Sequence, residues 1–288
     1  MTAFPPPPRK PFCLWKRVVR VVVLVALTMA GFLVGCQNRL IYFPQPYEHD
    51  EPAGFLKRGG SRIDFTTGEG HQSAWLIPPR DGAAMDRLWS VCNGNASTAL
   101  GMESWSRSLP FRKDAFLLFD YPGYGACEGS PHPSRIRESL HTVIPLAAKQ
   151  LQMTDADLHE RTCVFGHSLG CAAALIAVEE FHFRQAVLVS PFTSTMEMAR
   201  VRLKLPLGFL VWHRFDNRTG LACLKECGGH AWVFHGTADR IIPVEMSRTL
   251  AAEFPDVVSL QEFQGADHNG LLQTGSKKII AAMMEARR

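Results

Sequence analysis

A serine between two glycines, in Val164-Phe165-Gly166-His167-Ser168-Leu169-Gly170, constrains this chain more than any other stretch. An apolar, β-prone run at 163–165 precedes the pattern, and small residues at 170–174 follow it. We therefore predict a strand, a sharp turn with Ser168 at its tip, and then a helix. The flanking glycines and small residues are expected to let this helix pack closely against the sheet.

Apolar runs alternate with helical patterns along the rest of the chain. β-prone runs occur at 63–66, 72–77, 88–92, 115–119, 186–189, 231–234 and 257–263. Helical patterns, some of them weak, occur at 97–109, 134–151, 243–254 and 271–284. The turn at 67–70 predicts a hairpin, and Pro145 predicts a kink or an early break in its helix. The alternation predicts an α/β fold with a mostly parallel sheet and helices on both faces.

The first 35 residues form a separate unit, with a Pro-rich start, a basic stretch at 16–20 and an uncharged apolar run at 21–35. A run of this length is short for a membrane span and suits the hydrophobic region of a signal peptide. It ends in Leu33-Val34-Gly35-Cys36, which resembles the lipobox of bacterial lipoproteins. That resemblance implies cleavage before Cys36 and a lipid on its thiol.

The alternative is an uncleaved anchor helix that starts at Val18, and both interpretations bring the chain to a membrane. Gln37 stands where an Asp would resemble an inner-membrane retention signal. We therefore expect a lipid anchor on the periplasmic face of the outer membrane, with an inner-membrane anchor as the alternative. Residues 36–59 are expected to form an extended lead-in, and residues 60–288 the folded domain.

Charge and cysteine content exclude other classes. The net charge is +4, but residues 1–35 hold five basic residues and no acid, so the remainder carries −1 and no nucleic-acid partner is expected. Cys92, Cys163 and Cys171 fall in apolar segments and read as small core residues. Cys223 and Cys227 are four residues apart, which leaves their pairing open. Without a second pair at metal spacing, no metal site and no cofactor are expected.

Polar residues with the chemistry of acyl transfer follow the predicted strands. A nucleophilic serine needs a base, a carboxylate that orients the base, and donors for the oxyanion. Asp239 follows the strand at 231–234, and His268 follows the last strand. We predict Ser168 as nucleophile, His268 as base and Asp239 as the orienting acid. Asp239 as a simple helix cap and His268 as a surface loop residue are the alternatives.

From about residue 60 to its end, the chain resembles the α/β-hydrolase superfamily. The matching motifs are Gly166-His167-Ser168-Leu169-Gly170, Asp120-Tyr121-Pro122-Gly123-Tyr124-Gly125, His235-Gly236-Thr237-Ala238-Asp239 and Gly265-Ala266-Asp267-His268. The most similar branch includes depalmitoylases and bacterial hydrolases of the lysophospholipase and serine-aminopeptidase type. Its oxyanion loop reads His-Gly-Asn-Ala, whereas this chain has Asn93 in place of the His. The resemblance implies that the backbone N–H groups of Asn95 and Leu169 bind the oxyanion.

These features lead to three hypotheses for the activity. The first is a lipid-anchored serine hydrolase that cleaves esters or thioesters, such as those of palmitate, at a membrane. The second is a peptidase of the aminopeptidase type, and the third is a lipoprotein that keeps the fold without catalysis.

Residues 193–222 mix helical patches with Pro206 and Gly208, which predicts a small cap. The acyl specificity and the oligomeric state are not encoded in these motifs.

Overall fold

A computed structural model of the chain describes residues 12–82, 84–204 and 208–287. Its centre is an eight-stranded sheet in the order β1-β2-β4-β3-β5-β6-β7-β8. The strands are β1 Ser61–Thr67, β2 Gly70–Ile77, β3 Leu88–Cys92, β4 Ala115–Phe119, β5 Thr162–His167, β6 Gln185–Val189, β7 His230–Gly236 and β8 Val258–Phe263. Only β2 runs antiparallel to its neighbours, β1 and β4. The predicted hairpin and the mostly parallel sheet are therefore confirmed.

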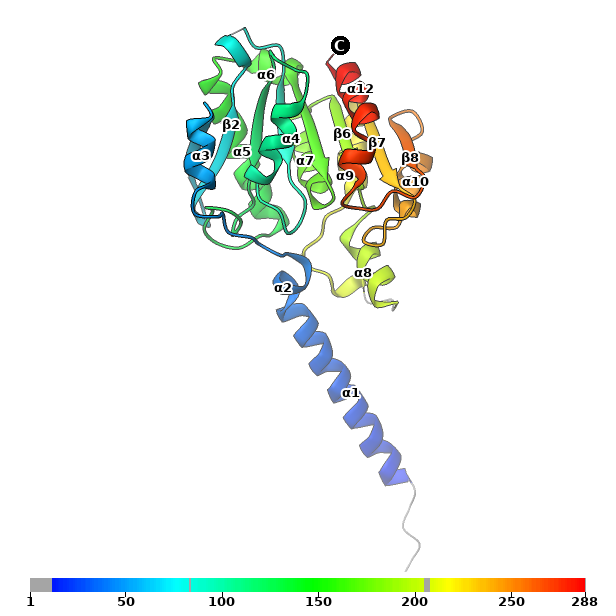
Figure 1. Ribbon diagram of the computed structural model, residues 1–288. Helices are drawn as coiled ribbons and strands as arrows, with labels where there is room; N and C mark the ends of the chain where they lie inside the picture. The colour runs from blue at the N-terminus through cyan, green and yellow to red at the C-terminus, as the bar shows by residue number, and fades with distance from the viewer. Residues whose placement is uncertain (1–11, 83, 205–207, 288) are drawn as a thin grey trace, which may run out of the picture.

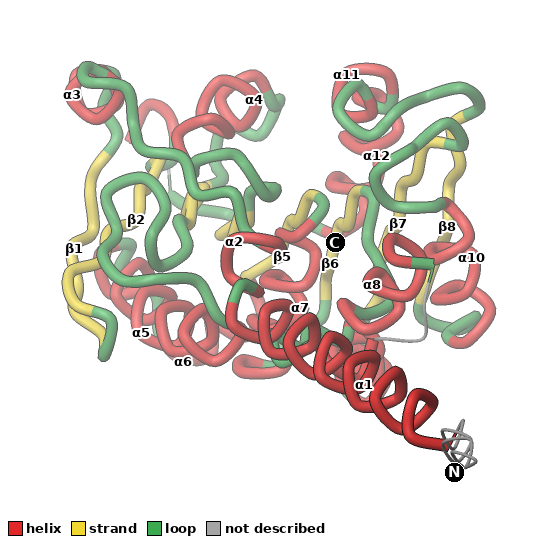
Figure 2. The backbone as a smooth tube through the Cα atoms, turned by 90° about the horizontal axis from the view of Figure 1, so that it is seen from below, coloured by secondary structure: helices red, strands yellow, loops and turns green. Residues whose placement is uncertain are grey.

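Helices cover both faces of this sheet (Figure 2). One face carries α5 Pro133–Gln150, α7 Leu169–Phe181, α9 Asn217–Glu226 and α10 Val244–Glu253, with α6 Asp155–Arg161 beside them. The other face carries α4 Glu103–Ser108 and α12 Ser276–Ala286, with α3 Glu51–Lys57 and α11 Leu271–Thr274 on the same side. Short 3-10 turns lie at Arg80–Gly82, Leu100–Met102 and Gly208–Leu210.

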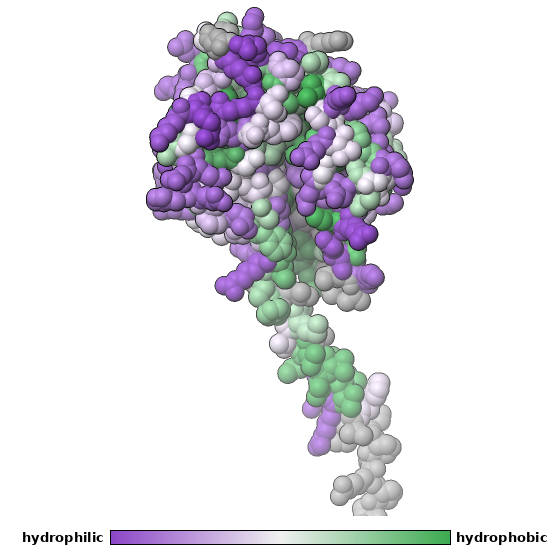
Figure 3. Space-filling model, in the orientation of Figure 1, coloured by the Kyte–Doolittle hydropathy of each residue, from purple (hydrophilic) through white to green (hydrophobic). Residues whose placement is uncertain are grey.

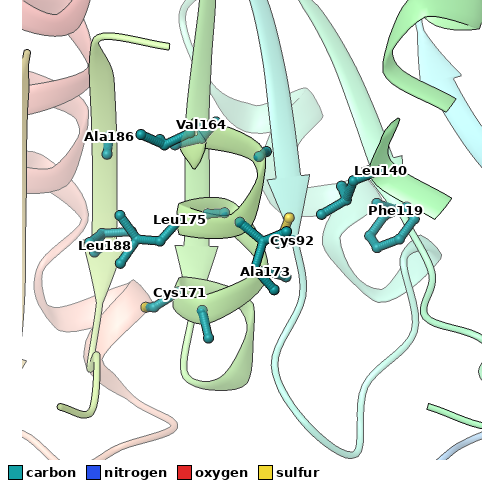
Figure 4. Packing of buried hydrophobic residues seen from close by; sticks show 14 of the residues in the cluster. Cys92, Phe119, Leu140, Val164, Cys171, Ala173, Leu175, Ala186 and Leu188 are labelled. Carbon is teal, nitrogen blue, oxygen red and sulfur yellow. The ribbon is translucent and has the colours of Figure 1, made fainter. Parts of the chain in front are cut away.

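The helix after the predicted turn, α7, lies at the centre of the larger apolar cluster. All its residues from Leu169 to Val178 are buried, and Figure 4 shows Ala173 and Leu175 of α7 in the same cluster as Cys92 of β3. On the sheet side, Val164 and Leu188 belong to the same cluster. Small side chains let α7 pack closely against the strands. This packing places Leu169, the first residue of α7, beside the end of β5.

Two helix predictions differ from the structure. α5 runs through Pro145 without an early break. Pro145 is exposed, so water can hydrate the carbonyl that loses its partner, while buried Val143, Ile144 and Ala147 hold the helix on the sheet. The last helix, in contrast, is divided at Gly275, whose N–H bonds the carbonyl of Leu271 and ends α11.

Two short helices lie within residues 36–59, where an extended lead-in was expected, and a long helix precedes them. α1 spans Phe12–Gly35 and α2 spans Gln37–Ile41, while α3 occupies 51–57. Figure 1 shows α1 projecting away from the domain, and Figure 3 shows hydrophobic residues along it. Its side chains at Val22, Leu24 and Leu27 are all more than 60% exposed. Among the helices of the described residues, none meets the length and apolarity that a membrane crossing requires.

The range predicted as a cap, 193–222, has two parts. α8, Thr195–Leu203, and the turn at 208–210 lie at the end of the domain where α2 joins it (Figure 1). α9 instead packs against α7, with Gly220 in contact with Leu175. Only the first part therefore stands apart from the layers of the sheet.

Candidate active site

Ser168 sits at a strained turn between β5 and α7. Its backbone has φ 56° and ψ −119°, a conformation that few non-glycine residues adopt. A Cβ on Gly166 would lie 2.5 Å from the carbonyl oxygen of Gly170, and one on Gly170 would lie 2.0 Å from that of Cys92. Both glycines are thus required by close backbone packing. Together they hold Ser168, which is 8% exposed, at the end of β5.

The sheet topology brings several strand ends to this serine. β3 lies between β4 and β5, with Cys92 paired to Gly166, so the loop at 93–96 starts beside the turn. Such a reversal of strand order is where open α/β sheets form their sites. On the other side, β6 lies next to β5, and the N–H of Ser168 donates to the carbonyl of Val189 at 2.9 Å.

Asp239 and His268 form a close pair. Nδ1 of His268 lies 2.6 Å from Oδ2 of Asp239, whose side chain is fully buried. Oδ1 of the same carboxylate accepts the backbone N–H groups of Ile241 and Ile242, each at 2.8 Å. Asp239 therefore also fixes the loop before α10, but it does not cap that helix, whose N-cap is Pro243. Burial by itself would raise the pKa of Asp239, but hydrogen bonds from His235, His268 and Ile242 lower it far below its usual value.

His268 lies beside the residue that precedes Ser168. The rings of His167 and His268 are 5.1 Å apart between centroids, and Nε2 of His167 lies 3.4 Å from the backbone oxygen of His268. Burial and the neighbouring His268 lower the pKa of His167 to about 4, so this ring is neutral at pH 7. Asp267, by contrast, accepts the N–H of Gly270 and so holds the loop after β8.

The two residues predicted to supply oxyanion donors line the same cavity as Ser168. Leu169 is the first residue of α7, where a backbone N–H has no acceptor within the helix. Asn95 follows Gly94 in the loop after β3, and both Asn95 and Leu169 line the cavity. Asn93, the departure from the family motif, is fully buried and donates from Nδ2 to the carbonyl of Ser97 at 2.6 Å. This bond joins the two ends of the loop at 93–97. Asn93 thus supports the loop, as the His of the His-Gly-Asn-Ala motif is expected to do.

The side chain of Asn95 makes contacts that the sequence did not predict. Nδ2 donates to the carbonyl of Ile41 at 2.6 Å, and Oδ1 accepts the N–H of Phe43 at 3.0 Å and the hydroxyl of Tyr124 at 2.6 Å. The loop is thus tied both to the N-terminal segment and to the Asp120–Gly125 motif. Aromatic residues at 42–47 were the only signal that this segment packs on the domain.

A cavity of about 420 Å³ opens over Ser168. Its lining is mostly apolar and comes from the residues around Ser168, the loops after β6 and β7, the cap with α8, and the segment 37–43. Arg202 is the one charged side chain among the described residues that line it. Ser168 thus lies in the wall of a mostly apolar pocket.

Comparisons with known proteins identify the architecture. Residues 91–222 match the sequence profile of the alpha/beta hydrolase family. An esterase of Pyrococcus furiosus superposes with a TM-score of 0.62 at 17% identity, over 85% of this chain and 96% of that one. The chain has the α/β-hydrolase fold. The sequence similarity to this family lies in the central part of the chain, from the end of β3 to α9.

Two relatives align over much of the chain. The uncharacterized protein Rv2307c of Mycobacterium tuberculosis is 28% identical over 253 residues, which cover 88% of this chain and 87% of the relative. Alpha/beta hydrolase domain-containing protein 17B of Homo sapiens is 25% identical over 178 residues, which cover 62% of this chain and 58% of the human protein. Both alignments extend the similarity beyond the region that the family profile matches.

Other polar residues near the sequence motifs have structural roles in this hydrolase fold. Asp120 accepts the N–H of Ala99 at 2.8 Å and the hydroxyl of Tyr47, and its burial raises its pKa to about 6. Glu128 accepts the N–H of His71 at 2.7 Å, and His132 caps α5. Each of these groups is already occupied in holding a loop or a helix end.

Three side chains of the described residues could jointly hold a metal ion. They are His182, Cys223 and Cys227, whose ligand atoms lie within 4.8 Å of one another. Cys223 and Cys227 are both free thiols, with 4.0 Å between their sulfurs. Cys223 also contacts Nδ1 of His182 at 3.4 Å. His182 follows α7, so its proximity to the cysteine pair of α9 comes from the packing of these helices.

Proposed function

We propose that this chain is a serine hydrolase that cleaves carboxylic ester or thioester bonds through an acyl-enzyme. The observation that carries the proposal is the 2.6 Å pairing of Asp239 with His268, which lies against His167, the residue before a serine held at a strained turn. The apolar cavity over Ser168 supports an acyl group as the buried part of the substrate. The similar fold of the Pyrococcus furiosus esterase also supports an ester as the substrate.

In the first half of the proposed reaction, Oγ of Ser168 attacks the substrate carbonyl while Nε2 of His268 takes its proton. Asp239 holds the imidazole through Nδ1 and stabilises its positive charge. The backbone N–H groups of Asn95 and Leu169 stabilise the oxyanion, where one such donor contributes about 3 kcal/mol. His268 then protonates the alcohol or thiol as it leaves.

In the second half, His268 takes a proton from water, and the resulting hydroxide attacks the acyl-enzyme. Collapse of the new tetrahedral intermediate releases the carboxylic acid, and His268 returns its proton to Oγ of Ser168. No cofactor or metal enters either half. The low pKa of Asp239 keeps its carboxylate charged throughout, as the orienting role requires.

We also propose that the hydrolase acts at a membrane, through a lipid on Cys36 after cleavage of residues 1–35. Cys36 is half-buried and directly precedes α2, so cleavage there would leave the folded domain intact. The expected location is the periplasmic face of the outer membrane, and an uncleaved inner-membrane anchor is the alternative. The mass of the mature protein distinguishes the lipid anchor from the uncleaved anchor. A cleaved chain begins at a lipidated Cys36, and Cys36→Ala should abolish this processing. An uncleaved chain keeps residues 1–35 in both the wild type and the variant.

Labelling with a fluorophosphonate probe tests the catalytic proposal. The wild-type chain should be labelled, and Ser168→Ala should not, whereas the control Ser97→Ala on the neighbouring loop should retain labelling. Labelling that persists in Ser168→Ala would reject this serine as the nucleophile. A panel of p-nitrophenyl esters and aminoacyl arylamides then separates an esterase from an aminopeptidase. The cavity favours esters, because its charged side chain, Arg202, would repel a substrate ammonium group.

A further inference from the structure

Part of the cavity wall comes from the N-terminal segment, outside the region that resembles the family. Residues 37–43 contribute four lining side chains: Gln37, Leu40, Ile41 and Phe43. Residues of the cap, including Met198 and Leu210, also line the cavity. The pocket above Ser168 is therefore incomplete without the segment that follows Cys36.

Gln37 fastens this segment to the cap. Its side chain is buried, and Nε2 donates to the carbonyl of Leu210 at 2.6 Å. Oε1 accepts the backbone N–H groups of Trp212 at 2.7 Å and His213 at 3.3 Å. A buried amide whose donor and acceptor are both used has one preferred position, because each alternative leaves a polar group unpaired.

Asn95 fastens the other end of the segment to the oxyanion loop. Its side-chain amide donates to the carbonyl of Ile41 and accepts the N–H of Phe43, as a neighbouring strand would. Two amides, one at each end, therefore hold residues 37–43 between the cap and the loop beside Ser168. The segment is built into the site and does not act as a loose tether.

We propose that residues 37–43 are a specificity-determining wall of a binding site for a linear acyl chain, with Gln37 as the positioning residue. The inference rests on the proposed function, since the chain is the acyl group that Ser168 would carry. A cavity of about 420 Å³ holds roughly a dozen methylene groups, if each needs about the 30 Å³ of a liquid water molecule. The wall begins one residue after Cys36, so a lipid there would hold the cavity beside the bilayer.

Chain-length selectivity of the full chain in lipid nanodiscs tests this wall. The measurement is the ratio of kcat/KM for the p-nitrophenyl esters of dodecanoic and acetic acid, in which substrate partitioning cancels between variants. Leu40→Ala and Ile41→Ala should each lower the ratio about fivefold, because the long chain loses apolar contacts. Leu56→Ala is the matched control, since Leu56 is a similarly exposed leucine on α3 that does not line the cavity.

The role of Gln37 is tested in the same way. Gln37→Ala should lower the ratio at least as much as Leu40→Ala, and Gln37→Glu should lower it less, because its carboxylate still accepts from Trp212. Asn38→Ala, at an exposed neighbouring position, should leave the ratio unchanged. If Gln37→Ala does not fold, Gln37→Glu and Leu40→Ala still decide the question.

The outcomes separate this inference from the proposed function. A ratio that stays within twofold of wild type in Leu40→Ala, Ile41→Ala and the Gln37 variants would overturn the wall while leaving the esterase proposal standing. Absence of ester turnover in the wild type, or turnover that survives Ser168→Ala, would overturn the proposed function and this inference with it. A lowered ratio confined to the wall variants supports both.

Discussion

The carboxylate of Asp239 serves two partners at once: Oδ2 pairs with Nδ1 of His268 at 2.6 Å, and Oδ1 accepts the N–H groups of Ile241 and Ile242. The first contact orients a proposed catalytic base, and the second fixes the loop that carries the carboxylate. Position and orientation of His268 therefore depend on one buried side chain. A substitution that keeps one side-chain oxygen but removes the negative charge separates the two roles.

Asp239→Asn is expected to lower kcat/KM by about 10⁴ while leaving the fold intact. The amide oxygen can still accept from the loop, but it neither balances an imidazolium nor enforces the required tautomer. Ester hydrolysis and urea unfolding of the same preparation measure the two effects. Asp267→Asn, one residue before His268, is the control and should stay within about threefold of wild type. A loss below tenfold for Asp239→Asn would contradict the role of this acid.

Gly170→Ala is expected to destabilise the protein by about 3 kcal/mol or to prevent folding. The added methyl would lie 2.0 Å from the carbonyl oxygen of Cys92, so either β3 or the start of α7 must move. Gly68→Ala is the control, because a methyl there meets only the Glu138 carboxylate at 3.7 Å. Urea unfolding measures both, and equal stability of the two variants would show that the turn tolerates a wider separation from β3.

Much of this arrangement could be predicted from the order of the sequence. Ser168, Asp239 and His268 each follow a parallel strand, and the carboxyl ends of such strands share one edge of the sheet. The contacts of Asn95 with Ile41 and Phe43 could not be predicted, since they join an irregular segment to a loop more than 50 residues away. His182 was missed for the same reason: only the packing of α7 on α9 brings it to Cys223.

The local sequence was also a poor guide where tertiary packing overrides it. Pro145 favours a helix break, yet its exposed position lets the buried side chains around it hold α5 together. The lead-in at 36–59 carries prolines and aromatics, which favour extended chain. Its helical turn at 37–41 is instead held by the bonds of Gln37 to the cap, which no local pattern encodes.

His167 is expected to make the protein less stable in acid. Its folded pKa of about 4 lies below the ordinary value of 6.5, so between these pH values the unfolded chain binds a proton that the folded chain does not. Stability is therefore lost as the pH falls from about 6.5 to 4. With allowance for the partial exposure of the ring, the loss is about 2 kcal/mol.

His167→Gln removes this titration and tests it. The free energy of unfolding in urea, measured at pH 7.5 and 4.5, should fall less with acid in the variant than in the wild type. His132 and His213, whose pKa values are also lowered by burial, contribute equally to both proteins and cancel in the comparison. An unchanged pH dependence would mean that the ring is hydrated when charged.

Tyr124→Phe is expected to lower kcat/KM about fivefold, through Asn95. The Tyr124 hydroxyl donates to Oδ1 of Asn95 at 2.6 Å, and without it the amide loses one of the three bonds that set the loop. The hydroxyl also accepts the N–H of Phe43 at 3.2 Å. Tyr124→Phe should therefore add to Asn95→Ala only the smaller effect of this second bond. Ester hydrolysis by the two single variants and the double variant gives the coupling. Full additivity of the two losses would show that Tyr124 influences the reaction by a route independent of Asn95.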